Sequence, residues 1–393
     1  MSLKLDKSTW KRVAFGDVVR NHNETLKDAT ANGIDRVIAM EHMDPGELEV
    51  PRWGNISDGT TFTRRVRPGQ TLFGKRRAYQ RKVAYAEFDA ICSGDIYTFE
   101  ADQTQILPEL LPFLVQSDPF FDHAIDTSAG SLSPRTNWRD LADFEFDVAP
   151  LDEQKRIADL LWAVERHQRG LTEQQSTALA TMGHLLRERF AANAGDIAKI
   201  SDLAAAVVGG VWGSPEGEDE VDVLALGPRV YANGATRLST DGSPTRSISR
   251  RQAATRVVES GDIILERSGG SPDQPVGRVV IADGDLPACI PTDFQRLIRP
   301  DSKAVEPLFL FWKLRSDWLE GATRDYSKRT TNIANLSVPA YLDRTIRVPS
   351  RAEQLRLVAD ADAIERALSS ISTELAATKR MRTTLLTETF GDN

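Results

Sequence analysis

The sequence predicts an α+β protein in which two globular domains alternate with two long helices. Three observations lead to this fold class. The stretch 148–190 recurs at 348–390, both copies have the heptad spacing of a helix that packs along a narrow seam, and the parts outside them mix short β-rich runs with brief helical stretches. With 393 residues, the chain is long enough for two or more domains that each have a core.

The internal repeat has a period of 200 residues and is clearest where each long helix is expected to begin. Val148–Ile157 and Val348–Leu357 share a Glu-Gln pair and the Arg that follows it. The match then continues without a gap to Phe190 and Phe390, which is hard to obtain by chance. The two segments are therefore expected to be copies of one structural unit.

Weaker matches precede each copy. Gly69–Phe73 resembles Gly261–Leu265, a turn glycine that enters a short apolar strand, and Ser133–Thr136 resembles Ser327–Thr330. The whole chain is thus expected to be an internal pseudo-two-fold repeat. Its predicted segments are a globular domain at 1–150, a spacer helix at 151–195, a second globular domain at 196–347 and a second spacer helix at 348–393.

Both spacer helices have a seam with 4-3 spacing. Pro150 lies just outside the first helix, Asp152 can cap it, and Glu153 adds negative charge to the first turn. The narrow seams and equal lengths predict that the helices pair as an antiparallel coiled coil, and the alternative is that each packs as a surface helix on its own domain. The seam positions are Ile157, Leu161, Val164, Gln168, Leu171, Gln175, Ala178, Met182 and Leu185, with counterparts Leu357, Ala361, Ile364, Leu368, Ile371, Leu375, Thr378, Arg382 and Leu385.

The globular parts have the mixed pattern of α+β domains. Lys82–Tyr85 and Arg278–Ala282 are short β-rich runs, whereas Pro108–Gln116 and Glu306–Leu314 are brief helical stretches. Glycine and proline separate these elements.

Charge is distributed unevenly along the chain. The net charge is −8, from 49 Lys and Arg against 57 Asp and Glu, which alone argues against a general nucleic-acid binder. Yet Gly59–Ala86 has eight basic residues and no acid, and Gly242–Val258 has four arginines and no acid. Such stretches can contact phosphates locally, and the alternative is that they are solvated strand edges.

Composition excludes several other classes. The two cysteines, Cys92 and Cys289, belong to no C-x-x-C pair, and the five histidines have no metal-ligand spacing, so no metal site is expected. The first fifteen residues lack the apolar region of a secretion signal, and no run approaches the length of a membrane span. The protein is expected to be cytoplasmic, without a membrane partner.

Catalytic motifs are incomplete. Gly69–Lys75 matches most of a phosphate-binding loop, but Arg76 replaces the Ser or Thr that binds magnesium, and no apolar strand precedes it. Glu153–Lys155 could end a nuclease motif, yet the repeat has Leu355 at the lysine position. Asp118–Phe121 lacks the second proline of a base-binding methyltransferase turn. We therefore expect no catalytic residue and no enzyme activity in this chain.

The helix start at 150–157, its copy at Glu353 and Gln354, and the approach Arg135–Asn137 resemble type I restriction-modification specificity subunits. The opening Trp10–Asp17, echoed by Ala198–Asp202, resembles them as well. The resemblance implies two target-recognition domains that each read half of a bipartite, asymmetric double-stranded DNA site. It also implies spacer helices that position two methyltransferase subunits, which restriction/translocase subunits then join. S-adenosylmethionine, ATP and magnesium would belong to those partners, with no cofactor in this chain.

Within this hypothesis, basic and amide side chains near the weaker repeats are the candidates for DNA contact. They are Arg64, Arg65, Lys75, Arg76, Arg77, Arg81, Lys82, Arg135 and Asn137 in the first domain, and Arg246, Arg250, Arg251, Arg267, Lys328, Arg329 and Asn332 in the second. Two other functions fit the same pattern: a stand-alone DNA-binding or anti-restriction protein on this scaffold, and a coiled-coil assembly protein with no DNA role.

Overall fold

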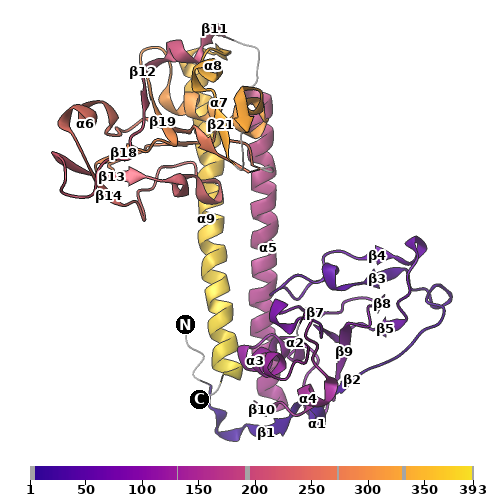
Figure 1. The fold of residues 1–393 in the computed structure, drawn as a ribbon. Coiled ribbons are helices and arrows are strands. Elements are labelled where there is room, and N and C mark those ends of the chain that lie inside the picture. Colours follow the sequence, from indigo (N-terminus) through magenta and orange to yellow (C-terminus); the bar gives the residue numbers. More distant parts are fainter. Residues whose placement is uncertain (1–4, 131, 191–194, 272–273, 330–332, 392–393) are drawn as a thin grey trace. The chain divides into compact units, whose positions relative to one another are not determined.

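The computed structural model describes residues 5–130, 132–190, 195–271, 274–329 and 333–391. The chain divides into two compact units, and each unit combines one globular domain with parts of both long helices (Figure 1). Unit 1 comprises Met1–Glu173 and Thr373–Asn393, and unit 2 comprises Gln174–Ser372. Both units mix helices and sheets, so the predicted α+β class is confirmed.

Unit 1 contains two four-stranded sheets and a two-stranded ribbon. The first sheet is antiparallel, in the order β2 (Val19–Asn21), β9 (Ile96–Ala101), β6 (Thr71–Gly74) and β7 (Val83–Tyr85). The second has the order β4 (Gly54–Asn55), β3 (Arg36–Ile38), β8 (Ala90–Cys92) and β5 (Arg64–Val66), with β3 parallel to β8. The ribbon joins β1 (Lys11–Ala14) to β10 (Glu145–Val148). The short helices are α1 (Phe15–Val18), α2 (Leu111–Val115), α3 (Asp118–Asp126) and α4 (Trp138–Ala142).

Unit 2 has the same order of strands in its four-stranded sheet, but its second sheet has three strands instead of four. Its four-stranded sheet runs β12 (Ala204–Gly209), β19 (Gln295–Pro300), β15 (Ile263–Glu266) and β17 (Val279–Ile281). The second sheet runs β14 (Thr245–Ile248), β13 (Val221–Leu226) and β18 (Cys289–Pro291), with β13 parallel to β18. The ribbon joins β11 (Asp196–Lys199) to β22 (Thr345–Val348), and a further sheet runs β16 (Ser268–Gly269), β21 (Ala334–Leu336) and β20 (Ser327–Arg329). The helices are α6 (Arg250–Arg256), α7 (Pro307–Leu319) and α8 (Val338–Leu342).

The long helices are α5 (Leu151–Arg189) and α9 (Arg351–Phe390), and both contribute to the cores of the units. In unit 1, Ile157 and Leu161 of α5 and Leu385 of α9 join a cluster of buried aromatic side chains. In unit 2, Leu186 of α5 and Leu357 of α9 do the same around Phe309 and Trp312. Burial of these apolar residues of the two helices contributes roughly 1.5–3 kcal/mol each.

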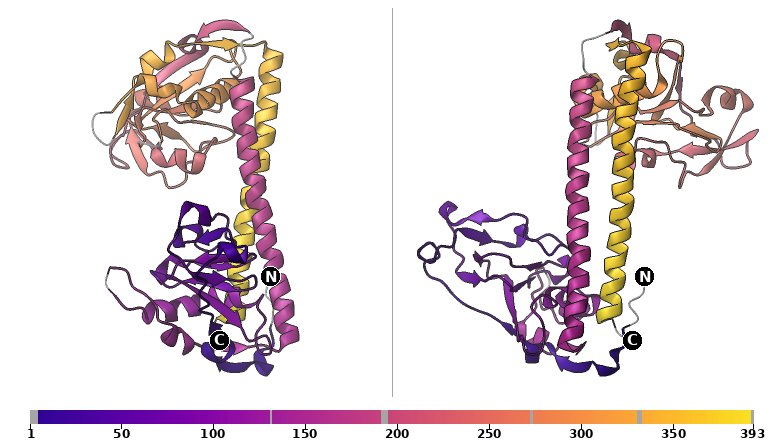
Figure 2. Two further views of the ribbon diagram at one scale, coloured as in Figure 1. Left: turned by 90° about the vertical axis from the view of Figure 1, so that its right-hand side faces the viewer. Right: turned by 180° about the vertical axis from the view of Figure 1, so that it is seen from behind.

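Segments of the two helices also contact each other inside each unit, and Figure 2 shows them side by side from two further directions. In unit 1, His167 Nε2 lies 2.9 Å from Glu374 Oε1, and Arg382 Nε lies 3.0 Å from Glu165 Oε2. In unit 2, the Gln175 amide donates to the Ser372 hydroxyl at 3.0 Å. The helices therefore pack on their domains and on each other within both units. Among the helices in the described part of the chain, none has both the length and the apolar character of a membrane span.

Most of the short elements expected from the sequence are confirmed. Strands β7 and β17 and helices α2 and α7 lie at the expected positions, with ends that differ by a few residues. The expected cap is wrong: α5 already begins at Leu151, the Gln154 amide donates to the Pro150 carbonyl, and Asp152 lies in the first turn. At the equivalent place the Ser350 hydroxyl accepts from the Glu353 amide.

A buried glutamine explains why the Glu-Gln pair recurs at both helix starts. The Gln154 amide group donates to the carbonyls of Ala149 and Gln105 at 2.8 Å, and its oxygen accepts from the Leu107 amide at 2.8 Å. Its counterpart Gln354 donates to the Pro349 carbonyl and accepts from the Glu306 amide, both at 2.8 Å. Gln154 thus fixes the first turn of α5 to the loop before α2, and Gln354 fixes the first turn of α9 to the residue before α7.

We expect Gln154→Ala to destabilise unit 1 by about 1–3 kcal/mol, because it leaves the half-buried Leu107 amide without its acceptor. Urea unfolding followed by circular dichroism measures the loss. Lys155→Ala, an exposed change one residue later, is the matched control and should shift the transition little. A Gln154→Ala protein that unfolds at the same urea concentration as the Lys155→Ala control would contradict this role.

Candidate nucleic-acid interface

In unit 1, two segments distant in sequence meet beside strand β6. The Thr136 amide donates to the Lys75 carbonyl at 3.0 Å, and the Arg77 amide donates to the Pro134 carbonyl at 2.7 Å. Arg76 and Arg135 form an isolated β-bridge between these hydrogen bonds. We call Lys75, Arg76, Arg77 and Arg135 the unit 1 basic cluster.

The unit 1 basic cluster keeps an excess of positive charge. Asp95 lies between two arginines, with its carboxylate oxygens 3.1 Å from Arg135 Nε and 3.7 Å from a terminal nitrogen of Arg76. One carboxylate therefore pairs with two guanidinium groups. The side chain of Arg76 remains 43% exposed and that of Arg135 remains 54% exposed. Partial burial and the nearby charge of Arg64 lower the pKa of Lys75 from its usual value. A ligand that brings negative charge would relieve this repulsion.

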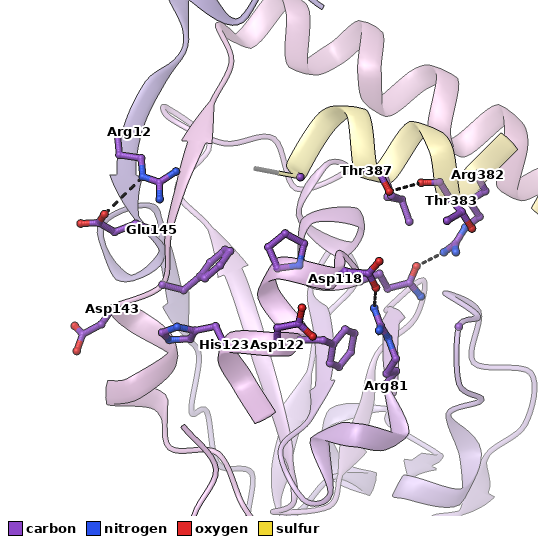
Figure 3. Close-up of a pocket in the computed structure, with 17 residues that line it drawn as sticks. Arg12, Arg81, Asp118, Asp122, His123, Asp143, Glu145, Arg382, Thr383 and Thr387 are labelled. Atoms are coloured by element: carbon purple, nitrogen blue, oxygen red, sulfur yellow. Dashed lines mark hydrogen bonds and ion pairs between the residues drawn. The ribbon is translucent and has the colours of Figure 1, made fainter. Parts of the chain in front are cut away.

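Other candidates in unit 1 already bind protein groups. Arg81 faces Asp118 on α3 and lies over the Phe121 ring, as Figure 3 shows for the Arg81–Asp118 pair. Lys82 donates to the Met40 carbonyl at 2.7 Å, and Arg64 donates to the Ile96 carbonyl.

Arg65 is only 19% exposed and pairs with Glu24 and Asp89. Asn137 stands exposed before α4, and its amide donates to Asp140 at 3.2 Å. Hence the side chains of Arg64, Arg65, Arg81 and Lys82 are held by protein groups. The side chains of Arg76, Arg135 and Asn137 are more accessible to a ligand.

A cleft of about 840 Å³ also opens in unit 1, between α3 and the C-terminal part of α9 (Figure 3). Its lining contains the basic residues Arg12, Arg81 and Arg382. Four acidic side chains oppose them: Asp118, Asp122, Asp143 and Glu145. The carboxylates would repel phosphates, so this cleft fits a nucleic acid less well than the unit 1 basic cluster.

In unit 2, the place of Lys75 is taken by Arg267. The Leu336 amide donates to the Arg267 carbonyl at 2.8 Å, as Thr136 does to Lys75. Ser268 then pairs with Asn335 in the strand ladder, where unit 1 has Arg76 opposite Arg135, and the Ser268 hydroxyl donates to the Asn335 side-chain oxygen at 2.6 Å.

This pairing corrects one weak match expected from the sequence. The structural counterpart of 133–136 is 333–336, at the same offset of 200 as the helices, and not Ser327–Thr330. Lys328 and Arg329 lie exposed on the next strand, β20. The short Ser-x-Arg-Thr likeness was misleading because strand pairing depends on distant hydrogen bonds, which a local motif does not encode.

The remaining unit 2 candidates lie on other elements. Arg246 on β14 stacks over the Trp212 ring, 5.0 Å from its centroid. Arg250 and Arg251 begin α6 and are exposed, and Arg250 lies 4.0 Å from Glu220. Asn332 lies outside the described residues.

Thus Arg267, Lys328 and Arg329 lie around the sheet formed by β16, β21 and β20. Arg246 lies on β14, and Arg250 and Arg251 lie on α6. Sequence reasoning missed Ser268 and Asn335. The 200-residue offset, applied strictly, would have found Asn335, because position 335 corresponds to Arg135 in the repeat. Asn335 brings an amide, which can form paired hydrogen bonds with an adenine edge, to the place of a guanidinium.

Comparison with known proteins identifies the class. Residues 7–181 match the family model of the type I restriction modification DNA specificity domain. Among curated proteins, the type I restriction enzyme EcoDI specificity subunit of Escherichia coli is 27% identical over 137 residues. That alignment covers 35% of this chain and 30% of the curated relative, so less than a third of the relative's length is matched.

Two solved structures share the fold. The S subunit of a type I restriction-modification system from M. genitalium superposes with a TM-score of 0.67 at 13% identity, over 100% of both chains. A chain from a structural study of complex assembly and conformational transition of the type I R-M system has a TM-score of 0.56 at 20% identity, over 98% of this chain and 99% of that one.

The matched model assigns residues 7–181 to a DNA specificity domain, and the two solved structures share the fold of the chain. Residues 7–181 are thus similar to the type I restriction modification DNA specificity domain.

Proposed function

We propose that this chain recognises a bipartite, asymmetric DNA site, with the globular domain of unit 1 reading one half and that of unit 2 reading the other. One observation supports this proposal: β6 and β15 have the same place in sheets of the same strand order, but the residues that follow them have different side chains. The same hydrogen-bonded position holds Arg76 and Arg135 in unit 1 but Ser268 and Asn335 in unit 2. Two domains that share a backbone arrangement but present different side chains recognise different half-sites.

We further propose that α5 and α9 form an antiparallel coiled coil that relates the two halves by pseudo-two-fold symmetry. The contacts His167 to Glu374 and Gln175 to Ser372, and the buried seam residues in both units, support this pairing. The coiled coil would fix the spacing between the two half-sites, as the dimer axis does in two-fold DNA-binding proteins.

The match of residues 7–181 to the type I restriction modification DNA specificity domain supports the proposed partners: two methyltransferase subunits and, through them, restriction/translocase subunits. In this proposal the partners bind S-adenosylmethionine, ATP and magnesium, and the present chain supplies sequence recognition and assembly. Co-purification with a methyltransferase subunit distinguishes it from a stand-alone DNA-binding or anti-restriction protein.

We expect the complex with its methyltransferase subunit to bind DNA at least about 100-fold more weakly at 200 mM than at 50 mM salt, because several phosphate contacts release counterions. Fluorescence anisotropy with a labelled duplex across this salt range measures the slope. An affinity independent of salt would contradict the assignment of the basic side chains to DNA and would favour an assembly protein with no DNA role.

A further inference from the structure

A single turn after β6 has an unusual backbone. Residues Ala78–Gln80 form a short 3₁₀ turn, and the arginines on either side of it are left-handed, with φ of 56° at Arg77 and 53° at Arg81. Within the described residues, these are the two non-glycine positions with positive φ. Side chains other than glycine are disfavoured there, and such positions persist where the surroundings impose them, frequently at functional sites.

The surroundings of this turn do impose its shape. Ala78 is buried beneath it, and the Arg77 amide donates to the Pro134 carbonyl at 2.7 Å. At the other end, the Arg81 amide closes the turn on the Ala78 carbonyl at 2.8 Å, and the Arg81 side chain is held by Asp118 and the Phe121 ring. The turn is therefore anchored at its base and at both ends.

The residue at the tip of the anchored turn is Tyr79. Its exposed fraction is 54%, higher than that of any other aromatic side chain in the described ranges. Every charged residue from Arg76 to Lys82 is basic, and an arginine lies two residues from Tyr79 on each side. A large aromatic ring is thus presented to solvent by a rigid, positively charged support, where it has little to pack against in the free protein.

We propose that Tyr79 is a base-contacting, specificity-determining residue for the half-site read by unit 1. This inference rests on the proposed DNA-reading function and names a residue that acts in it. The exposed guanidinium groups of Arg76 and Arg135 would neutralise phosphates, while the tyrosine ring packs on base edges such as a thymine methyl group in the groove. A fixed tip reads bases well because little rotational freedom is lost when DNA binds.

The test uses the full chain in complex with its methyltransferase subunit, and duplexes in which each base pair of its recognition site is changed in turn. For Tyr79→Ala we expect the penalty for a wrong base pair to fall about tenfold at one or two adjacent positions of one half-site. The salt slope should stay unchanged, because tyrosine carries no charge to exchange with counterions. Tyr79→Phe, which keeps the ring, should retain most of the preference.

Ile125→Ala is the matched control, since Ile125 is another exposed apolar side chain of unit 1, on α3. It should leave the preference at every position unchanged. If Tyr79→Ala keeps the full preference at all positions while Arg76→Ala with Arg135→Ala lowers the salt slope, the inference about Tyr79 is wrong and the DNA-reading function stands. If neither change alters binding, the assignment of this surface to DNA fails as well.

Discussion

Replacing Arg76 and Arg135 together by alanine is expected to weaken binding at one half-site by about 100-fold, because each arginine contact to a base or phosphate contributes about 1–3 kcal/mol. The double change also removes both cationic partners of Asp95, whose carboxylate would then face the phosphates unpaired. Arg135 is the natural partner of Arg76 in this test, because the two form a β-bridge and share Asp95.

Base preference in the other half-site should not change. The globular domain of unit 2 reads that half in our proposal, and contributions from separate domains are nearly additive. Competition binding with duplexes mutated in one half or the other measures both preferences. The matched control is Arg12→Ala with Arg52→Ala, because these arginines are similarly exposed, at 52% and 51%, and are also paired with carboxylates. Equal relaxation of both halves would contradict two independent readers.

A second large effect is expected when the chain is cut into its two repeats. Residues 196–393 alone should form a homodimer that binds an interrupted palindrome, because two identical readers related by two-fold symmetry see the same sequence on opposite strands. The second copy can supply Leu385, Leu386 and Phe390 where unit 2 now uses residues 185 and 186 of α5 and residue 190 just after it. The residue types at the three paired positions are identical.

Residues 1–195 should dimerise more weakly, by 100-fold or more, for a reason that involves one buried acid. Glu165 is 3% exposed and pairs with Arg382 at 3.0 Å. A second copy of 1–195 would place Met182 there, and an unpaired buried charge costs about 3–5 kcal/mol. In the 196–393 dimer, by contrast, Arg382 meets Glu365, the counterpart of Glu165.

Light scattering on the two purified fragments at tens of micromolar measures the difference. In the 1–195 fragment, Glu165→Gln should strengthen dimerisation because it removes the charge and keeps the side-chain shape. Monomers for both fragments at these concentrations would contradict pairing of the helices across the repeat.

The parts of the fold that were predictable are those set by local sequence. The seam spacing and the recurring Glu-Gln pair predicted both long helices, and the structure explains the pair through Gln154 and Gln354, which bind loops nearby. Asp152 resembled a cap because of its type, but a helix that begins at Leu151 leaves it in the first turn.

The candidate site was less predictable because it depends on contacts between distant residues. A run of basic residues does not reveal that Arg65 is paired with Glu24 or that Lys82 binds the Met40 carbonyl. The arrangement of Arg76 beside Arg135 needs a bridge between segments more than fifty residues apart. Tyr79 gave no signal, since the left-handed residues that present it are arginines rather than glycines.

The most direct test of the central claim is selection of binding sites from a random duplex library by the complete complex with its methyltransferase subunit. Two different readers on one spacer predict two specified blocks of different sequence, separated by a gap of fixed length without base preference. A single contiguous block, two identical inverted blocks, or no sequence preference would contradict the reading of an asymmetric bipartite site by two different domains on one spacer.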